Sequence, residues 1–181
     1  MRRIVAGLFI SLDGVVEAPE TWHFPYFDED MGQAVTARMR AADAMLLGRR
    51  TYDAFAAHWP HQDATRDPMA ATMNATPKYV VSATLTDPAW ENTTVLAGDP
   101  RKELERLKER PGKDIGITGS PTLVSWLLRE GLLDELNLLV HPLVVGAGKR
   151  LFEGGTGQIP LTLTHSATFG TGVLNLTYTR A

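Results

Sequence analysis

The chain has 181 residues, of which 44% are hydrophobic and 22% charged, and its formal net charge is −3 at pH 7. This small negative charge argues against a nucleic-acid-binding surface, which usually carries a basic excess. The absence of cysteine excludes disulfides, thiol catalysis and thiolate metal sites. We expect one globular domain over residues 1–181, because this length and composition can bury a single core.

The first segment of the chain imitates a signal peptide, with a basic start followed by apolar residues. Asp13 closes the apolar stretch early, so a buried strand over residues 3–12 is the better interpretation. No stretch approaches the roughly 20 apolar residues that cross a bilayer. We therefore expect a cytoplasmic protein that has no membrane partner.

Beyond this strand, predicted strands and helices alternate along the chain. The predicted strands cover residues 3–12, 43–48, 78–82, 93–97, 114–118, 135–145, 161–169 and 173–180. The predicted helices cover residues 28–42, 51–59, 100–110 and 121–129. Strand–helix alternation followed by a terminal hairpin indicates an α/β domain, with a mostly parallel sheet and an antiparallel edge.

The junction after the second predicted strand holds two adjacent arginines. Gly48 ends that strand, Arg49 and Arg50 follow, and the helical pattern begins at Thr51. The start of a helix carries roughly half a positive charge, so a cation there is normally disfavoured by about 0.3–1 kcal/mol. A bound anion would reverse that sign, and guanidinium groups pair well with phosphate oxygens. The alternative is that both arginines simply face solvent.

A second junction of this kind follows the fifth predicted strand. In Gly119-Ser120-Pro121-Thr122, Ser120 is a natural helix cap, and Pro121 suits a position whose N–H is unpaired. Because ligands collect at the carboxyl ends of parallel strands, the two junctions together could hold the diphosphate of a nucleotide. A capped helix start is also ordinary structure. A third glycine cluster, residues 145–150, looks like a dinucleotide fingerprint, but it lacks the third glycine and a following helix and is interpreted as a bend between two strands.

Several further motifs occur in a fixed order along the chain. In chain order they are Ser11-Leu12-Asp13-Gly14, Leu47-Gly48-Arg49-Arg50-Thr51-Tyr52, Lys78-Tyr79-Val80-Val81-Ser82, Gly119-Ser120, Leu133-Asp134-Glu135-Leu136, and Pro142 with Gly146-Ala147-Gly148-Lys149-Arg150-Leu151-Phe152. This ordered set resembles the dihydrofolate reductase-like fold. The branch it resembles contains the reductase domain of bifunctional riboflavin-biosynthesis enzymes. The resemblance implies a three-layer domain with helices on both faces of the sheet.

The resemblance also implies a reductase that uses NADPH. The cofactor-binding residues it implies are Leu8, Phe9 and Val16 around the nicotinamide, Gly48, Arg49, Arg50 and Thr51 at the phosphates, Val81 and Ser82 at the adenosine, and Gly119, Ser120, Pro121 and Thr122 at the second phosphate-side turn. One arginine would meet the 2′-phosphate that distinguishes NADPH from NADH. Dihydrofolate reductases have Gly-Gly where this chain has Gly119-Ser120, so the backbone there could differ.

The catalytic acid is less well defined by the resemblance. Dihydrofolate reductases carry one acidic residue on the first helix, whereas this chain has Asp28, Glu29 and Asp30 in succession. One of the three would be the catalytic residue, or all three are first-turn acids that the helix dipole favours. Nothing in their spacing selects one, and folate as the substrate is in doubt.

An aromatic loop precedes these acids. Trp22, Phe24 and Phe27 could bind the substrate by stacking on a planar ring, or they could pack the loop itself. His141 is expected to be a core histidine. No metal site is expected, because Pro60 breaks any helical arrangement of His58 and His61 and no third ligand is evident.

The leading hypothesis is an NADPH-dependent oxidoreductase that reduces a C=N or C=O bond. Its substrate would be small and heterocyclic or ribityl-bearing, similar to 5-amino-6-(5-phosphoribosylamino)uracil. The alternatives are dihydrofolate reductase activity and a non-catalytic NADP-binding module or dimeric scaffold. The resemblance also implies a homodimer. The apolar stretch over residues 136–145 and the terminal hairpin could form its contact, or the stretch could simply be a central strand of a monomer.

Overall fold

The computed structural model describes residues 1–154 and 157–181. The strands are β1 (Ile4–Ser11), β2 (Ala42–Gly48), β3 (Lys78–Val81), β4 (Thr93–Leu96), β5 (Asp114–Thr118), β6 (Glu135–His141), β7 (Leu161–Thr168) and β8 (Leu174–Arg180). The α-helices are α1 (Glu29–Ala41), α2 (Arg49–Ala56), α3 (Pro68–Ala75), α4 (Pro100–Glu109) and α5 (Pro121–Glu130), and the short 3-10 helices are η1 (Pro19–Thr21), η2 (Phe24–Tyr26) and η3 (Trp59–His61).

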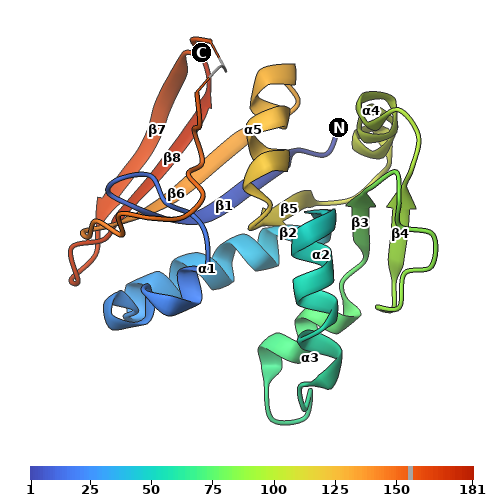
Figure 1. Cartoon of the computed structure of the whole chain (residues 1–181), viewed down its shortest axis with the longest axis horizontal. Helices are drawn as coiled ribbons and strands as arrows, with labels where there is room; N and C mark the ends of the chain where they lie inside the picture. Colours follow the sequence, from blue (N-terminus) through green and yellow to red (C-terminus); the bar gives the residue numbers. More distant parts are fainter. Residues whose placement is uncertain (155–156) are drawn as a thin grey trace.

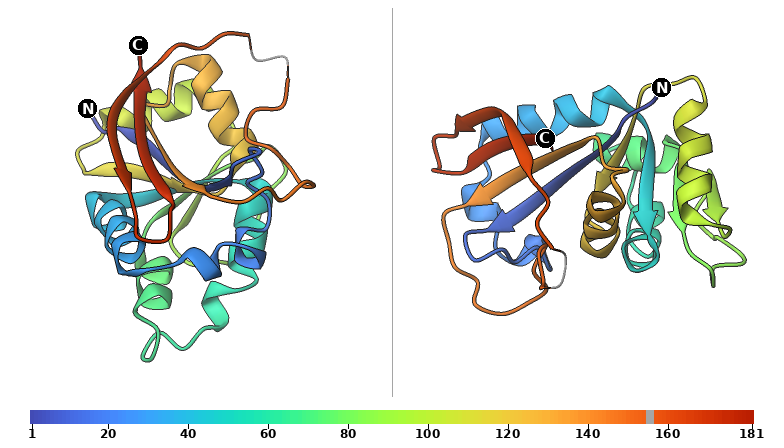
Figure 2. Two further views of the ribbon diagram at one scale, coloured as in Figure 1. Left: turned by 90° about the vertical axis from the view of Figure 1, so that its left-hand side faces the viewer. Right: turned by 90° about the horizontal axis from the view of Figure 1, so that it is seen from above.

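The strands form one eight-stranded sheet in the order β4-β3-β2-β5-β1-β6-β8-β7. The six strands from β4 to β6 are parallel, whereas β8 pairs antiparallel with β6 and β7 pairs antiparallel with β8. Figures 1 and 2 show α1, α2 and α3 on one face of the sheet and α4 and α5 on the other. The predicted α/β architecture, with its mostly parallel sheet, terminal hairpin and three layers, is confirmed.

The centre of the sheet divides the core into two sides. Ile4, Ala6, Leu8 and Ile10 of β1 alternate along the strand and belong to the largest buried cluster, which includes the inner faces of α4 and α5. Phe9 packs on the other side, against a cluster that contains Met31 of α1. Burying one such side chain contributes about 1.5–3 kcal/mol, so both helical layers are needed to cover this strand.

Among the α-helices of the described residues, three begin with an aspartate cap and two do not. The carboxylate of Asp28 accepts a hydrogen bond from an N–H in the first turn of α1, as those of Asp67 and Asp99 do for α3 and α4. No side chain caps α2 or α5 in this way. Uncapped first-turn N–H groups are available to another acceptor. The two uncapped helices are those that follow the predicted phosphate-binding junctions.

Four sequence expectations need correction. α2 begins at Arg49, two residues before the predicted start, because Gly48 in extended conformation is its N-cap. The hydroxyl of Ser120 does not cap α5. β6 ends at His141, four residues early, because Pro142 has no N–H to continue the ladder. α3, with Asp67 as its cap, was not predicted.

The position of β6 agrees with the second alternative for the start of the 136–145 stretch, a central strand. β6 lies between β1 and β8, and both Leu136 and Leu139 are 1% exposed. This part of the 136–145 stretch is therefore an interior strand of the domain and is not available to a second chain.

Candidate functional site

The two predicted phosphate-binding junctions lie side by side and are hydrogen-bonded to each other. The backbone N–H of Gly48 donates to Oγ of Ser120 over 2.9 Å. The N–H of Ser120 donates in return to Oγ1 of Thr51 over 3.0 Å. We call residues 48–51 and 119–122 the paired junctions. These reciprocal bonds hold the starts of α2 and α5 together at the carboxyl edge of β2 and β5.

The backbone of the second junction is left-handed over two residues. Gly119 has φ +74° and Ser120 has φ +56°. A side chain at Gly119 would bring a Cβ to 3.2 Å from Cγ2 of Thr51. A non-glycine residue in this conformation costs roughly 1–2 kcal/mol, and the two hydrogen bonds of Ser120 offset that cost. Ser120 therefore joins the two turns. This role accounts for a serine at the position where dihydrofolate reductases have the second glycine of their Gly-Gly pair.

The two arginines have different surroundings. Nε of Arg49 donates to both carboxylate oxygens of Asp53, over 2.8 and 2.9 Å. Its Nη1 lies 3.4 Å from Oγ1 of Thr84. Arg50 is exposed, and no acceptor among the described residues contacts its guanidinium. Both cations lie in the first turn of α2, where the field of the helix disfavours them and favours an anion.

The predicted adenosine residues are next to the first junction. Val81 is the register partner of Gly48 in the parallel pair of β2 and β3. Oγ of Ser82 accepts hydrogen bonds from the N–H groups of Thr84 and Leu85, over 3.2 and 3.1 Å, and closes a turn there. This turn and the guanidinium of Arg49 meet at Thr84.

The three residues predicted around the nicotinamide lie at two faces of the sheet. Leu8 and Val16 are 5% and 8% exposed and belong to the core cluster beneath α4 and α5. The ring of Phe9 faces the α1 side and stacks on His23, with ring centroids 4.6 Å apart. Leu8 and Phe9 lie in the carboxyl half of β1 and Val16 in the loop after it. This end of β1 is next to the second junction because β1 pairs with β5.

The three candidate acids are divided between two surface grooves along α1. Asp28 and Glu29 line a groove of about 710 Å³. Asp30 lines a smaller groove of about 490 Å³ between α1 and the terminal hairpin. Asp28 also caps α1 through the N–H of Met31 over 2.9 Å, and Glu29 accepts from Nε2 of Gln33. The acids are thus no longer equivalent, since only two share a groove with a candidate substrate residue.

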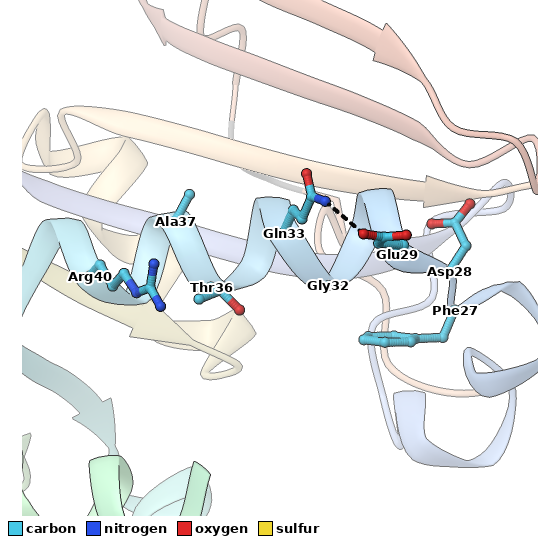
Figure 3. Close-up of a pocket in the computed structure, with 8 residues that line it drawn as sticks. All are labelled: Phe27, Asp28, Glu29, Gly32, Gln33, Thr36, Ala37 and Arg40. Carbon is cyan, nitrogen blue, oxygen red and sulfur yellow. Dashed lines mark hydrogen bonds between the residues drawn. The ribbon is translucent and has the colours of Figure 1, made fainter. Parts of the chain in front are cut away.

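The larger groove has an aromatic end and a cationic end. In Figure 3 the ring of Phe27 lies beside Gly32, and Thr36 and Arg40 follow along the same side of α1. A Cβ at Gly32 would meet the Phe27 ring at 3.5 Å, an ordinary van der Waals contact, so the ring lies directly against this turn of α1. Phe27 is 49% exposed and can stack on a planar ligand. Arg40 was not predicted, because its charge is ordinary for the last turn of a helix.

The aromatic loop before α1 has both buried and exposed side chains. Phe24 is 64% exposed, whereas Trp22 is 8% exposed and donates from Nε1 to the carbonyl of Glu17 over 3.1 Å. The Trp22 ring lies edge-on to His141, which is fully buried, with ring centroids 5.1 Å apart. Trp22 therefore packs the loop against β6, and Phe24 and Phe27 are the members that a ligand could reach.

Asp13 organises the loop that follows β1. Its carboxylate accepts hydrogen bonds from Oγ of Ser11 over 2.6 Å and from the N–H groups of Val145 and Gly146 over 3.0 and 2.9 Å. These donors, Ser11 foremost, hold the pKa of Asp13 well below its ordinary value. An ionised, fully bonded carboxylate is an anchor for the 145–150 loop and not a proton donor.

The described residues contain neither a metal-binding cluster nor a membrane-spanning helix. Within residues 1–154 and 157–181, no group of three or more histidine, aspartate or glutamate side chains could hold a metal ion. Among the helices of the same ranges, none has the length and apolar character needed to cross a bilayer.

Comparison with known proteins agrees with this architecture. Residues 2–175 match the sequence model of the RibD C-terminal domain family. The uncharacterized protein YyaP of Bacillus subtilis (strain 168) is 32% identical over 183 residues, which covers 98% of this chain and 94% of YyaP.

Two solved structures share the fold. A putative riboflavin biosynthesis protein from Shewanella sp. PV-4 superposes with a TM-score of 0.79 at 20% identity, covering 100% of this chain and 99% of that one. A pyrimidine reductase-like protein from Corynebacterium diphtheriae gives a TM-score of 0.67 at 15% identity, with coverages of 99% and 92%.

Proposed function

Because this chain belongs to the RibD C-terminal domain family, a riboflavin-biosynthesis-type reductase family, we propose that it is an NADPH-dependent reductase. Its reaction is hydride transfer to a C=N or C=O bond of a small heterocyclic or ribityl-bearing substrate. A compound similar to 5-amino-6-(5-phosphoribosylamino)uracil fits this description. The nicotinamide supplies the hydride when it is bound. The residues of this chain bind the cofactor and the substrate, orient them toward each other and supply the proton.

The observation that carries the proposal is the pair of uncapped helix starts. α2 and α5 begin without a side-chain cap, whereas α1, α3 and α4 each have an aspartate. Their first turns are joined by the bonds between Gly48, Ser120 and Thr51. Free N–H groups from two helices, with two arginines beside them, are suited to a diphosphate.

Along the carboxyl edge of the sheet, the strand order gives a direction to the cofactor. β3, with Ser82, takes the adenosine, the paired junctions take the diphosphate, and the end of β1 is next to the nicotinamide. Arg49, which is in contact with the Ser82–Thr84 turn, is the ligand of the 2′-phosphate. Phe27 stacks on the substrate ring in the groove of α1, and Asp28 or Glu29 at the same end delivers the proton.

Replacing Arg49 tests the cofactor assignment. We expect Arg49→Ala to weaken NADPH binding by roughly ten- to a hundred-fold, the value of a charge-assisted hydrogen bond, and to leave NADH binding nearly unchanged. Fluorescence titration measures both affinities. Arg66→Ala is the matched control, since Arg66 is 88% exposed in its side chain and pairs with Asp63 outside the site. Equal losses for NADPH and NADH would contradict the 2′-phosphate role.

A turnover assay distinguishes this function from its alternatives. Loss of the NADPH absorbance band with an aminouracil substrate supports the proposal. Oxidation only with dihydrofolate, blocked by methotrexate, would favour dihydrofolate reductase activity. Tight NADPH binding without oxidation across pterins, aminouracils and quinones would favour a non-catalytic binding module.

The edge of the sheet supports a homodimer as part of the same proposal. β7 pairs only with β8 among the described strands, has neither proline nor a charged residue, and leaves Leu163 49% exposed. Such an unprotected edge is a template for pairing with another chain. Sedimentation at micromolar concentration should give twice the mass of one chain, and Leu163→Lys should lower it to that of one chain. A single-chain mass for the wild type would exclude pairing.

A further inference from the structure

A loop that the sequence indicated only as a bend brings a cation to the second junction. Nζ of Lys149 donates a hydrogen bond of 2.5 Å to Oγ1 of Thr122, in the first turn of α5. No carboxylate of the described residues lies within ion-pair distance of this ammonium group. Lysine has three donors, so two remain for another acceptor. The charge of Lys149 is therefore uncompensated beside an uncapped helix start.

The main chain of Lys149 is fixed by the loop that follows β1. Its N–H donates to Oε2 of Glu17 over 2.9 Å, and its carbonyl accepts from the N–H of Val16 over 2.9 Å. Asp13 holds the start of the same loop through Val145 and Gly146. These four hydrogen bonds to residues after β1 fix the main chain that carries Lys149.

The strand order identifies which end of a dinucleotide would meet this cation. Arg49 and the Ser82 turn lie toward β3, whereas Lys149 is attached to the loop after β1, on the opposite side of the β5–α5 junction. Two cations therefore stand at opposite ends of the paired junctions. NADPH offers a phosphate to each cation, because its 2′-phosphate would meet Arg49 and the nicotinamide-side phosphate of its diphosphate would reach toward Lys149.

We propose that Lys149 binds the cofactor phosphate on the nicotinamide side, with Thr122 orienting its ammonium group. This inference rests on the proposed function and adds a ligand that the family resemblance did not assign. It also gives the glycine-rich loop a role. Gly148 has φ +116°, and a Cβ there would lie 3.0 Å from Cγ1 of Val15, so only a glycine lets the loop pack closely enough to deliver Lys149.

Nucleotide fragments test the position of this contact. NADPH and NADH both carry the nicotinamide-side phosphate, whereas adenosine 2′,5′-bisphosphate carries only the 2′-phosphate and the adenosine-side phosphate. We expect Lys149→Gln to weaken NADPH and NADH about ten-fold each, the value of one charge-assisted contact, and to leave the bisphosphate unchanged. Arg49→Ala should show a different pattern, in which the affinities for NADPH and the bisphosphate fall and the affinity for NADH is nearly unchanged.

Controls separate this role from a purely structural one. Lys149→Arg keeps the charge and should retain most of the affinity, and Lys113→Gln, at the opposite edge of the sheet before β5, should change nothing. An unaltered NADPH affinity in Lys149→Gln would overturn the assignment, as would an equal loss for all three ligands. Wild-type protein that binds neither dinucleotide would overturn the proposed function itself, and the role of Lys149 with it.

Discussion

The paired junctions and the aromatic cluster around His141 differ in the hydrogen bonding and solvent exposure of their polar groups. We define this cluster as Phe9, Trp22, His23, Tyr26 and His141, whose rings contact one another. At the paired junctions, polar groups are either bonded across the two turns or open to solvent. In the cluster, Nδ1 of His23 and Nε2 of His141 are buried without a hydrogen-bond partner among the described residues.

This difference fits the proposed function, in which the junctions bind a ligand and the cluster packs the loop. Exposed donors retain bonds with water that an anion can replace at little cost. A buried, unpartnered nitrogen keeps its desolvation cost and is tolerated only while it stays neutral. We therefore expect the junctions to bind phosphates. We expect the stability of the cluster to depend on its side chains and on pH.

The largest expected effect lies in the cluster. Trp22→Ala removes a buried ring and its bond to Glu17, so we expect a loss of about 3–5 kcal/mol in the free energy of unfolding. Phe24→Ala, in the same loop but 64% exposed, should cost less than about 0.5 kcal/mol. Urea denaturation measures both. Similar losses for the two variants would mean that the loop is not packed as described.

A smaller loss is expected at the paired junctions. Gly119→Ala places a Cβ in a left-handed conformation and against Thr51, and should destabilise the protein by roughly 1–2 kcal/mol. Gly146→Ala is the matched control, since Gly146 has φ +84° but no atom within 4 Å of the added Cβ. The difference between the two melting temperatures isolates the contact with Thr51. If the two variants melt together, the turns are not in close contact.

The smallest expected effect is the pH dependence of the cluster. Burial lowers the pKa of His23, and the neighbouring His141 lowers it further. Burial likewise lowers the pKa of His141, although its Nδ1 lies 2.8 Å from the carbonyl oxygen of Leu139. Below about pH 6.5 the unfolded chain binds protons that the folded chain resists, so stability falls as the pH falls through the folded pKa values.

Melting temperatures between pH 7.5 and 5 test this dependence. The melting temperature of the wild type should fall on acidification. In His23→Phe the melting temperature should fall less steeply with decreasing pH. His165→Gln, on the exposed face of β7, should keep it. An unchanged slope in His23→Phe would show that the acid sensitivity arises elsewhere.

The sequence predicted the paired junctions better than the cluster for a physical reason. A strand that ends in glycine before a helix is a local pattern, readable from Gly48 and Gly119 alone. The bond that joins these turns spans 72 positions, and no local pattern contains it. The same holds for Lys149, whose partner Thr122 lies 27 positions away.

Buried polar groups were the least predictable part of the molecule. Lys78 begins a strand in the sequence, yet it is fully buried, donates to the carbonyls of Asn74 and Glu91, and lies 4.2 Å from the centre of the Trp90 ring. Burial lowers the pKa of Lys78 to about 8. Such a site depends on three segments meeting, and hydrophobic periodicity does not report it.

The most direct test of the central claim is a crystal structure of the protein with NADPH. We predict the diphosphate between residues 48–51 and 119–122, with the 2′-phosphate on Arg49 and the nicotinamide toward the end of β1. A dinucleotide bound away from both junctions, or crystals that exclude NADPH at saturating concentration, would contradict the account.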